Sequence, residues 1–151
     1  MAQRVTGALM MRMVATMTAG LGAIGATTML SRTVWDGVYS EAQAARGKAA
    51  YEKSCASCHG TDLAGGGLAP SLVADAFAER WKDGPVGDIF IVTKATMPQD
   101  RPSTLTDEAY ADIVAYLLRA SEYPSGPQDL STDPSELAQI TFDKPAPGPK
   151  Q

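Results

Sequence analysis

The pentapeptide Cys55-Ala56-Ser57-Cys58-His59 holds both cysteines and the single histidine of this 151-residue chain. Two thiols three residues apart lie on the same side of a helical turn, so each can form a thioether with one vinyl group of a haem. A histidine directly after the second thiol is then held beneath the iron. This C-x-x-C-H spacing predicts one haem c, covalently attached through Cys55 and Cys58, with His59 as an axial ligand.

Two other uses of a C-x-x-C pair compete with haem attachment. A zinc site needs two further ligands, and the chain has no other cysteine or histidine. A redox dithiol of the thioredoxin type belongs in a β-α-β setting, and the sequence shows no alternating strand pattern. Haem attachment is therefore the preferred interpretation.

Met97 is the candidate for the second axial ligand. The other methionines stand at positions 1, 10, 11, 13, 17 and 29, in the N-terminal segment. Pro98 follows Met97, and a proline stiffens a loop that must hold a thioether against iron. The alternative is that Met97 only fills a gap in the core. With no second histidine in the chain, we interpret Met97 as the ligand, because histidine and methionine are a known haem ligand pair.

Residues 1–31 are predicted to be a signal peptide or an N-terminal membrane anchor. Arg4 and Arg12 precede an uncharged run over 13–31 that is rich in alanine, glycine, methionine and threonine. A basic start, an apolar middle and small residues around 23–26 fit a cleaved signal peptide. The run is also long enough to span a bilayer, and membrane contact is expected only if the segment is retained. In both cases the rest of the chain lies outside the cytoplasm, so we expect a periplasmic location.

Amphipathic patterns predict an all-α domain over 32–123. Ser40 is expected to cap the first helix in a capping box with Gln43, and Thr106 is expected to cap the last helix. Residues 61–71 are expected to form a loop, because three consecutive glycines and a proline exclude a regular element. The helices are expected from Ser40 to the cysteines, around 75–82, over 86–95 and from Thr106 to about 119.

Residues 124–151 are expected to form a proline-rich C-terminal extension. Six prolines exclude a long helix there, so the segment either wraps the domain or stays disordered. Four apolar side chains are candidates for anchoring it: Leu130, Leu137, Ile140 and Phe142.

The charge of the chain argues against a nucleic-acid partner. Its formal net charge is −4 at pH 7, whereas nucleic-acid binding calls for a basic surface. An acidic chain instead suits a protein partner that presents lysines or arginines.

Residues 40–120 resemble a class I cytochrome c. The run Gly47–Tyr51 (GKAAY) ahead of the C-x-x-C-H motif is similar to the N-terminal helix of that family, and Ile113–Leu117 (IVAYL) is similar to its C-terminal helix. The resemblance implies that the two helices cross at close range, with Gly47 making room. A glycine inside a helix costs about 1 kcal/mol relative to alanine, so the packing has to compensate.

The same resemblance implies roles for Pro70 and Trp81. Ala69–Leu72 is similar to the loop whose proline carbonyl accepts a hydrogen bond from the ligand histidine, so Pro70 is expected to orient the ring of His59, unless it only breaks the loop. Trp81 is expected to donate its indole N–H to a haem propionate, or else to be a core tryptophan. Packing around the haem is expected from Phe77, Ile89, Phe90 and Leu105.

The resemblance implies a carrier of single electrons and not an enzyme. With both axial positions filled, the iron would alternate between ferric and ferrous states at a positive potential. Val34–Tyr39 and Tyr123–Gly126 are similar to segments of bacterial cytochromes that serve, or are fused to, periplasmic dehydrogenases. The expected partners are therefore such a dehydrogenase and a terminal oxidase or other acceptor. Three alternatives stay open: a cytochrome subunit of a dehydrogenase complex, an open-site haem peroxidase or gas sensor, and a binding module with a structural haem.

Overall fold

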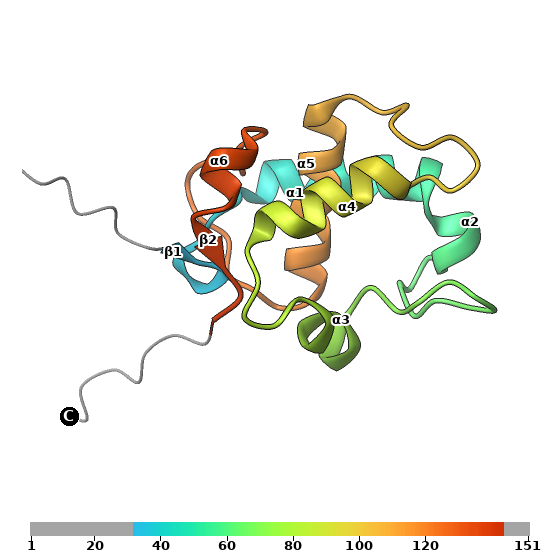
Figure 1. The fold of residues 1–151 in the computed structure, drawn as a ribbon, viewed down its shortest axis with the longest axis horizontal. Helices are drawn as coiled ribbons and strands as arrows, with labels where there is room; N and C mark the ends of the chain where they lie inside the picture. The colour runs from blue at the N-terminus through green and yellow to red at the C-terminus, as the bar shows by residue number, and fades with distance from the viewer. Residues whose placement is uncertain (1–31, 144–151) are drawn as a thin grey trace, which may run out of the picture.

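Residues 32–143 are described in the computed structural model (Figure 1). In chain order the elements are β1 (Arg32–Thr33), the 3-10 helix η1 (Val34–Asp36), α1 (Glu41–Ser54), α2 (Ala56–His59), α3 (Ala74–Trp81), α4 (Val86–Thr96), α5 (Asp107–Ala120), α6 (Pro134–Leu137) and β2 (Ile140–Thr141). Among the regular elements of residues 32–143, all are helical apart from one pair of two-residue strands. The predicted all-α fold is confirmed.

The crossing of α1 and α5 forms the centre of the fold (Figure 1). A Cβ added to Gly47 would lie 1.7 Å from the carbonyl oxygen of Asp112 and 3.0 Å from the Cβ of Tyr116. The two backbones therefore meet at a point where only a glycine fits. This is the close crossing that the sequence predicts, and Gly47 makes it sterically possible.

Helix α5 is buried over most of its length. Residues 110–118 are all buried, because α1 and α4 both pack against this helix. Beside the crossing, the rings of Tyr51 and Tyr116 are 5.4 Å apart. The N-terminus of α5 is capped as expected, with the side chain of Thr106 accepting a hydrogen bond from the backbone N–H of Ala109.

The capping box expected at the start of α1 is only half formed. The hydroxyl of Ser40 accepts from the N–H of Gln43 at 3.0 Å, as predicted. The buried side chain of Gln43 turns away to the C-terminal segment, where Nε2 donates to the carbonyl of Leu130 at 3.0 Å and Oε1 accepts from its N–H at 2.6 Å. The prediction of a reciprocal box was wrong, because a distant backbone satisfies this buried amide.

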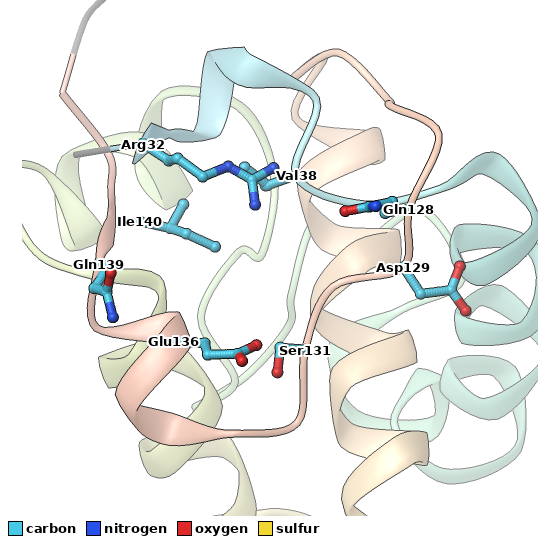
Figure 2. A pocket seen from close by; sticks show the side chains of 8 residues that line it. All are labelled: Arg32, Val38, Gln128, Asp129, Ser131, Glu136, Gln139 and Ile140. Atoms are coloured by element: carbon cyan, nitrogen blue, oxygen red, sulfur yellow. The ribbon is translucent and has the colours of Figure 1, made fainter. Parts of the chain in front are cut away.

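Residues 124–143 of the predicted extension pack on the domain and share its core. Leu130, Leu137, Ile140 and Phe142 are all buried, and β2 pairs in parallel with β1. The strands were not foreseen, because two residues are too few for an alternating pattern. Between this segment and the start of the domain lies a small cavity of about 210 Å³, which contains none of the predicted site residues (Figure 2).

The predicted N-terminal targeting segment and the last part of the extension, 144–151, lie outside the described residues. Within 32–143, no helix combines the length and the apolar character needed to cross a bilayer.

Candidate functional site

A cavity of about 1130 Å³ opens between α2, the loop that follows it, α3 and α4. Pockets for small molecules and cofactors are usually about 300–1,000 Å³, so this cavity is large enough for a cofactor. Its apolar walls include Tyr51, Leu72, Phe77, Ile89, Ile113 and Leu117. The structure brings all six residues singled out from the sequence to its lining: Cys55, Cys58, His59, Pro70, Trp81 and Met97.

The two cysteines and His59 stand on one turn at the end of α1. The N–H of Cys55 still bonds to the carbonyl of Tyr51 at 2.8 Å, and the N–H of His59 bonds to the carbonyl of Cys55 at 3.0 Å. No disulfide joins the two thiols. Tyr51 also fixes this turn, because its hydroxyl donates to the carbonyl of Gly60 at 2.7 Å. Burial of the Tyr51 side chain raises its pKa to about 12.

The competing interpretations of the cysteine pair find no support in this geometry. Burial raises the pKa of the Cys55 thiol to about 11, so the thiolate that a redox dithiol needs is disfavoured at neutral pH. Within residues 32–143, no three side chains of the histidine, cysteine, aspartate and glutamate types cluster in a way that could hold a metal ion. A zinc site therefore lacks the ligands it requires.

The ring of His59 is oriented by the loop that follows α2. Its Nδ1 lies 3.0 Å from the carbonyl oxygen of Pro70, and a carbonyl can only accept, so Nδ1 carries the proton. Nε2 is then the nitrogen with a free lone pair. The loop closes tightly at Gly65, where φ is +78° and an added Cβ would lie 2.5 Å from the carbonyl oxygen of Ala69.

Met97 caps the C-terminal end of α4 and is fixed by α5. Its N–H bonds to the carbonyl of Thr93 at 2.8 Å, and the hydroxyl of Tyr110 donates to its carbonyl at 2.7 Å. This role of Tyr110 was not foreseen from the sequence. Its chemistry is the one available signal, because a buried tyrosine usually finds a partner for its hydroxyl, and Tyr110 is 1% exposed.

Cationic side chains also line the cavity, although the chain is acidic. Lys53, Arg80 and Arg101 face it together with one acid, Asp100, which pairs with Arg101 at 3.0 Å. The guanidinium of Arg80 stacks over the ring of Trp81 at 5.4 Å. These basic residues could not be foreseen from the sequence, because isolated lysines and arginines form no motif.

Together these residues fit a haem. The two thiols match its vinyl groups, the imidazole and the thioether match its iron, and Arg80 beside Trp81 matches a propionate. Of the expected packing residues, Phe77 and Ile89 line the cavity, whereas Phe90 and Leu105 pack in the core. The difference arises on α4, because consecutive helical side chains point in different directions and Ile89 and Phe90 cannot both face the cavity.

A comparison with known families decides the class of protein. Residues 42–117, half of the chain, match the family model described as "Cytochrome C oxidase, cbb3-type, subunit III". The chain belongs to this family of c-type cytochromes. The resemblance to a class I cytochrome c is confirmed. Membership of this family implies that the chain binds haem c covalently and transfers electrons.

A solved structure is also similar to this cytochrome. It is the sulfane dehydrogenase SoxCD from Paracoccus pantotrophus, with a TM-score of 0.46 and 21% sequence identity; the match covers 82% of this chain and 68% of the other. No curated protein matches the chain.

Proposed function

We propose that this cytochrome is a mono-haem electron carrier of the periplasm whose iron is ligated by His59 and Met97. One observation carries the proposal: both cysteines, His59 and Met97 line a single cavity, and the Nδ1 of His59 is 3.0 Å from the carbonyl of Pro70. That contact leaves Nε2 as the ligating atom and fixes the ring before ligation, as partners of ligand histidines do.

Each residue of the site has a distinct task in this proposal. Cys55 and Cys58 hold the haem by thioethers, His59 and Met97 ligate its iron, and Tyr110 fixes the backbone of Met97. The guanidinium of Arg80, which stacks over Trp81, and the indole N–H of Trp81 bind the propionates. The bound haem supplies one-electron chemistry, alternating between ferric and ferrous iron.

The ligand set favours a carrier over a peroxidase or gas sensor. Methionine sulfur stabilises ferrous iron, so a positive reduction potential is expected. His59 is the single histidine, and both of its nitrogens are engaged, one by Pro70 and one by the iron. No histidine is left to serve as a distal acid or base, which peroxide chemistry commonly uses.

A periplasmic dehydrogenase is the proposed donor, and a terminal oxidase or another redox protein is the proposed acceptor. The support is the resemblance of Val34–Tyr39 and Tyr123–Gly126 to segments of dehydrogenase-associated cytochromes. These two segments lie against each other: the N–H of Gly126 donates to the carbonyl of Tyr39 at 2.7 Å. The same resemblance also supports a second candidate function, a fixed cytochrome subunit of a dehydrogenase complex.

An optical spectrum of protein matured with haem-attachment machinery tests the ligation. The wild type is expected to be low-spin, with a weak sulfur-to-iron band in the ferric state. Met97→Ala is expected to abolish that band and to lower the potential. The matched control is Val92→Ala, which changes another side chain of the same lining and should keep the band. A high-spin wild type would favour the sensor or peroxidase, and an absence of covalent haem would refute the proposal.

The size and mass of the protein recovered from the periplasm separate the carrier from the subunit. A free carrier is expected to elute as a single small protein that membranes can reoxidise. Co-elution with a dehydrogenase subunit would support the second candidate. The same mass measurement shows whether the segment 1–31 is removed.

A further inference from the structure

Helix α3 forms one wall of the cavity but is weakly anchored by its own sequence. Phe77, Arg80 and Trp81 line the cavity, and Phe77 is the buried side chain of the helix. No side chain caps its N-terminus at Val73. A helix of eight residues is marginal by itself, so its position depends on what packs behind it.

The packing behind α3 comes from the C-terminal segment. The ring of Phe142 meets that of Phe77 edge to face, with centroids 5.9 Å apart, and meets Tyr123 at 5.9 Å on its other side. The backbone of the same residue is also fixed, because its N–H donates to the carbonyl of Gly84 at 3.0 Å. Phe142 therefore touches the middle of α3 and the turn that follows it.

These contacts link the C-terminal segment to the cavity through Phe77. Phe77 both lines the cavity and packs against Phe142, which is itself only 6% exposed. Removing the ring of Phe142 would open a void beside Phe77. Helix α3, which carries Trp81, would then be free to shift, because side chains in a close-packed interior move when a neighbouring void opens.

We propose that Phe142 is a positioning residue for the haem site: it holds the α3 wall against the cavity and thereby sets the redox environment of the iron. The inference rests on the proposed function, since the group it positions is the haem. It assigns a task to the C-terminal segment, which lies beyond the part of the chain that matches the cytochrome family.

The test compares Phe142→Ala with Leu130→Ala in the haem-loaded protein. Both substitutions truncate a buried side chain of the C-terminal segment, but Leu130 is attached to α1 through Gln43. Both variants are expected to melt at a lower temperature. Only Phe142→Ala is expected to lower the midpoint potential and to weaken the ferric sulfur-to-iron band, because a looser wall admits water near the iron.

Hydrogen exchange of the backbone gives a readout that does not depend on redox behaviour. The amides of α3 are expected to exchange about tenfold faster or more in Phe142→Ala, with α1 and α5 unchanged. Phe142→Leu keeps much of the side-chain volume. Its midpoint potential and the protection of its α3 amides are expected to lie between those of Phe142→Ala and those of the wild type. It also serves as the test variant if Phe142→Ala does not fold.

The outcomes separate the two proposals. Equal effects of Phe142→Ala and Leu130→Ala on potential, band and α3 exchange would overturn the positioning role and leave the carrier function intact. An unchanged potential and unchanged α3 exchange in Phe142→Leu, where Phe142→Ala does not fold, would do the same. A wild type without covalent haem would refute the carrier function, whereas the exchange of α3 would still report what Phe142 holds.

Discussion

The crossing of α1 and α5 differs from the α3 wall of the cavity in the contacts that hold it in place. At the crossing, backbone meets backbone through Gly47, and residues 110–118 of α5 are buried without a break. Helix α3 instead has the cavity in front of it, and Phe142 supports its one buried side chain from behind. The first region is held by the packing of helix on helix. The second depends on a side chain from a segment far away in the sequence.

Gly47→Ala should break the first region and have the largest effect. The new Cβ would lie 1.7 Å from a carbonyl oxygen of α5, and a backbone atom cannot move aside without separating the helices. The free energy of unfolding is expected to fall by at least about 3 kcal/mol, measured by denaturant titration.

Gly66→Ala, in the loop beside the cavity, is the matched control. No atom lies within 4 Å of its added Cβ, so a change within about 0.5 kcal/mol is expected. If the two alanine variants were equally stable, the crossing would not be the close contact described above.

Tyr110→Phe tests the hydrogen bond that joins α5, the buried helix of the crossing, to Met97 in the lining of the cavity. The substitution removes the hydroxyl that donates to the carbonyl of Met97 at 2.7 Å and leaves the apolar face of α5 in place. Stability is expected to fall by about 1–2 kcal/mol, and the ferric sulfur-to-iron band should weaken, because the ligand loop is less well fixed.

Tyr116→Phe makes the same chemical change on the same helix at a residue that packs against Tyr51. Its band is expected to match that of the wild type. A band unchanged in Tyr110→Phe as well would mean that the loop holds Met97 without help from α5.

Asp129→Asn examines how firmly charge holds the C-terminal segment, and its effect should be the smallest. Hydrogen bonds from Ser40 and then from Arg46 lower the pKa of Asp129 from its ordinary 3.8. A carboxyl with a lowered folded-state pKa contributes stability above its unfolded pKa and loses it as the pH falls through the folded value. The wild type should therefore lose more stability than Asp129→Asn on acidification below pH 3.8.

The size of that difference is expected to stay under about 1 kcal/mol, because Asp129 and Arg46 are about half exposed and water screens them. Thermal unfolding at neutral pH and near pH 3 measures it. Identical acid sensitivity in the two proteins would show that the ion pair between Arg46 and Asp129 does not help to hold the C-terminal segment on the domain.

The features that could be predicted from the sequence depend on residues that are close together in the chain. The haem motif, the helix from Ser40, the cap at Thr106 and the glycine-rich loop are all local patterns, and each has its expected place in the structure. The glycine of the crossing could be foreseen only through the family resemblance.

What could not be predicted lies in contacts between residues far apart in the chain. The side chain of Gln43 bonds to Leu130, 87 residues away, where a local capping partner was expected. The hydroxyl of Tyr110 and the ring of Phe142 find their partners in the same way. Such pairings leave no periodicity, because each depends on how elements meet after they have formed.

The contact between His59 and Pro70 has a consequence for the order in which the molecule assembles. It closes a loop of only 11 residues, whereas the bond from Gln43 to Leu130 closes one of 87. The entropy of closing the longer loop is greater by about 2 kcal/mol. The histidine side of the site therefore needs only residues up to 70. The α3 wall also needs Phe142, so a segment from late in the sequence completes a site that the first half of the chain begins.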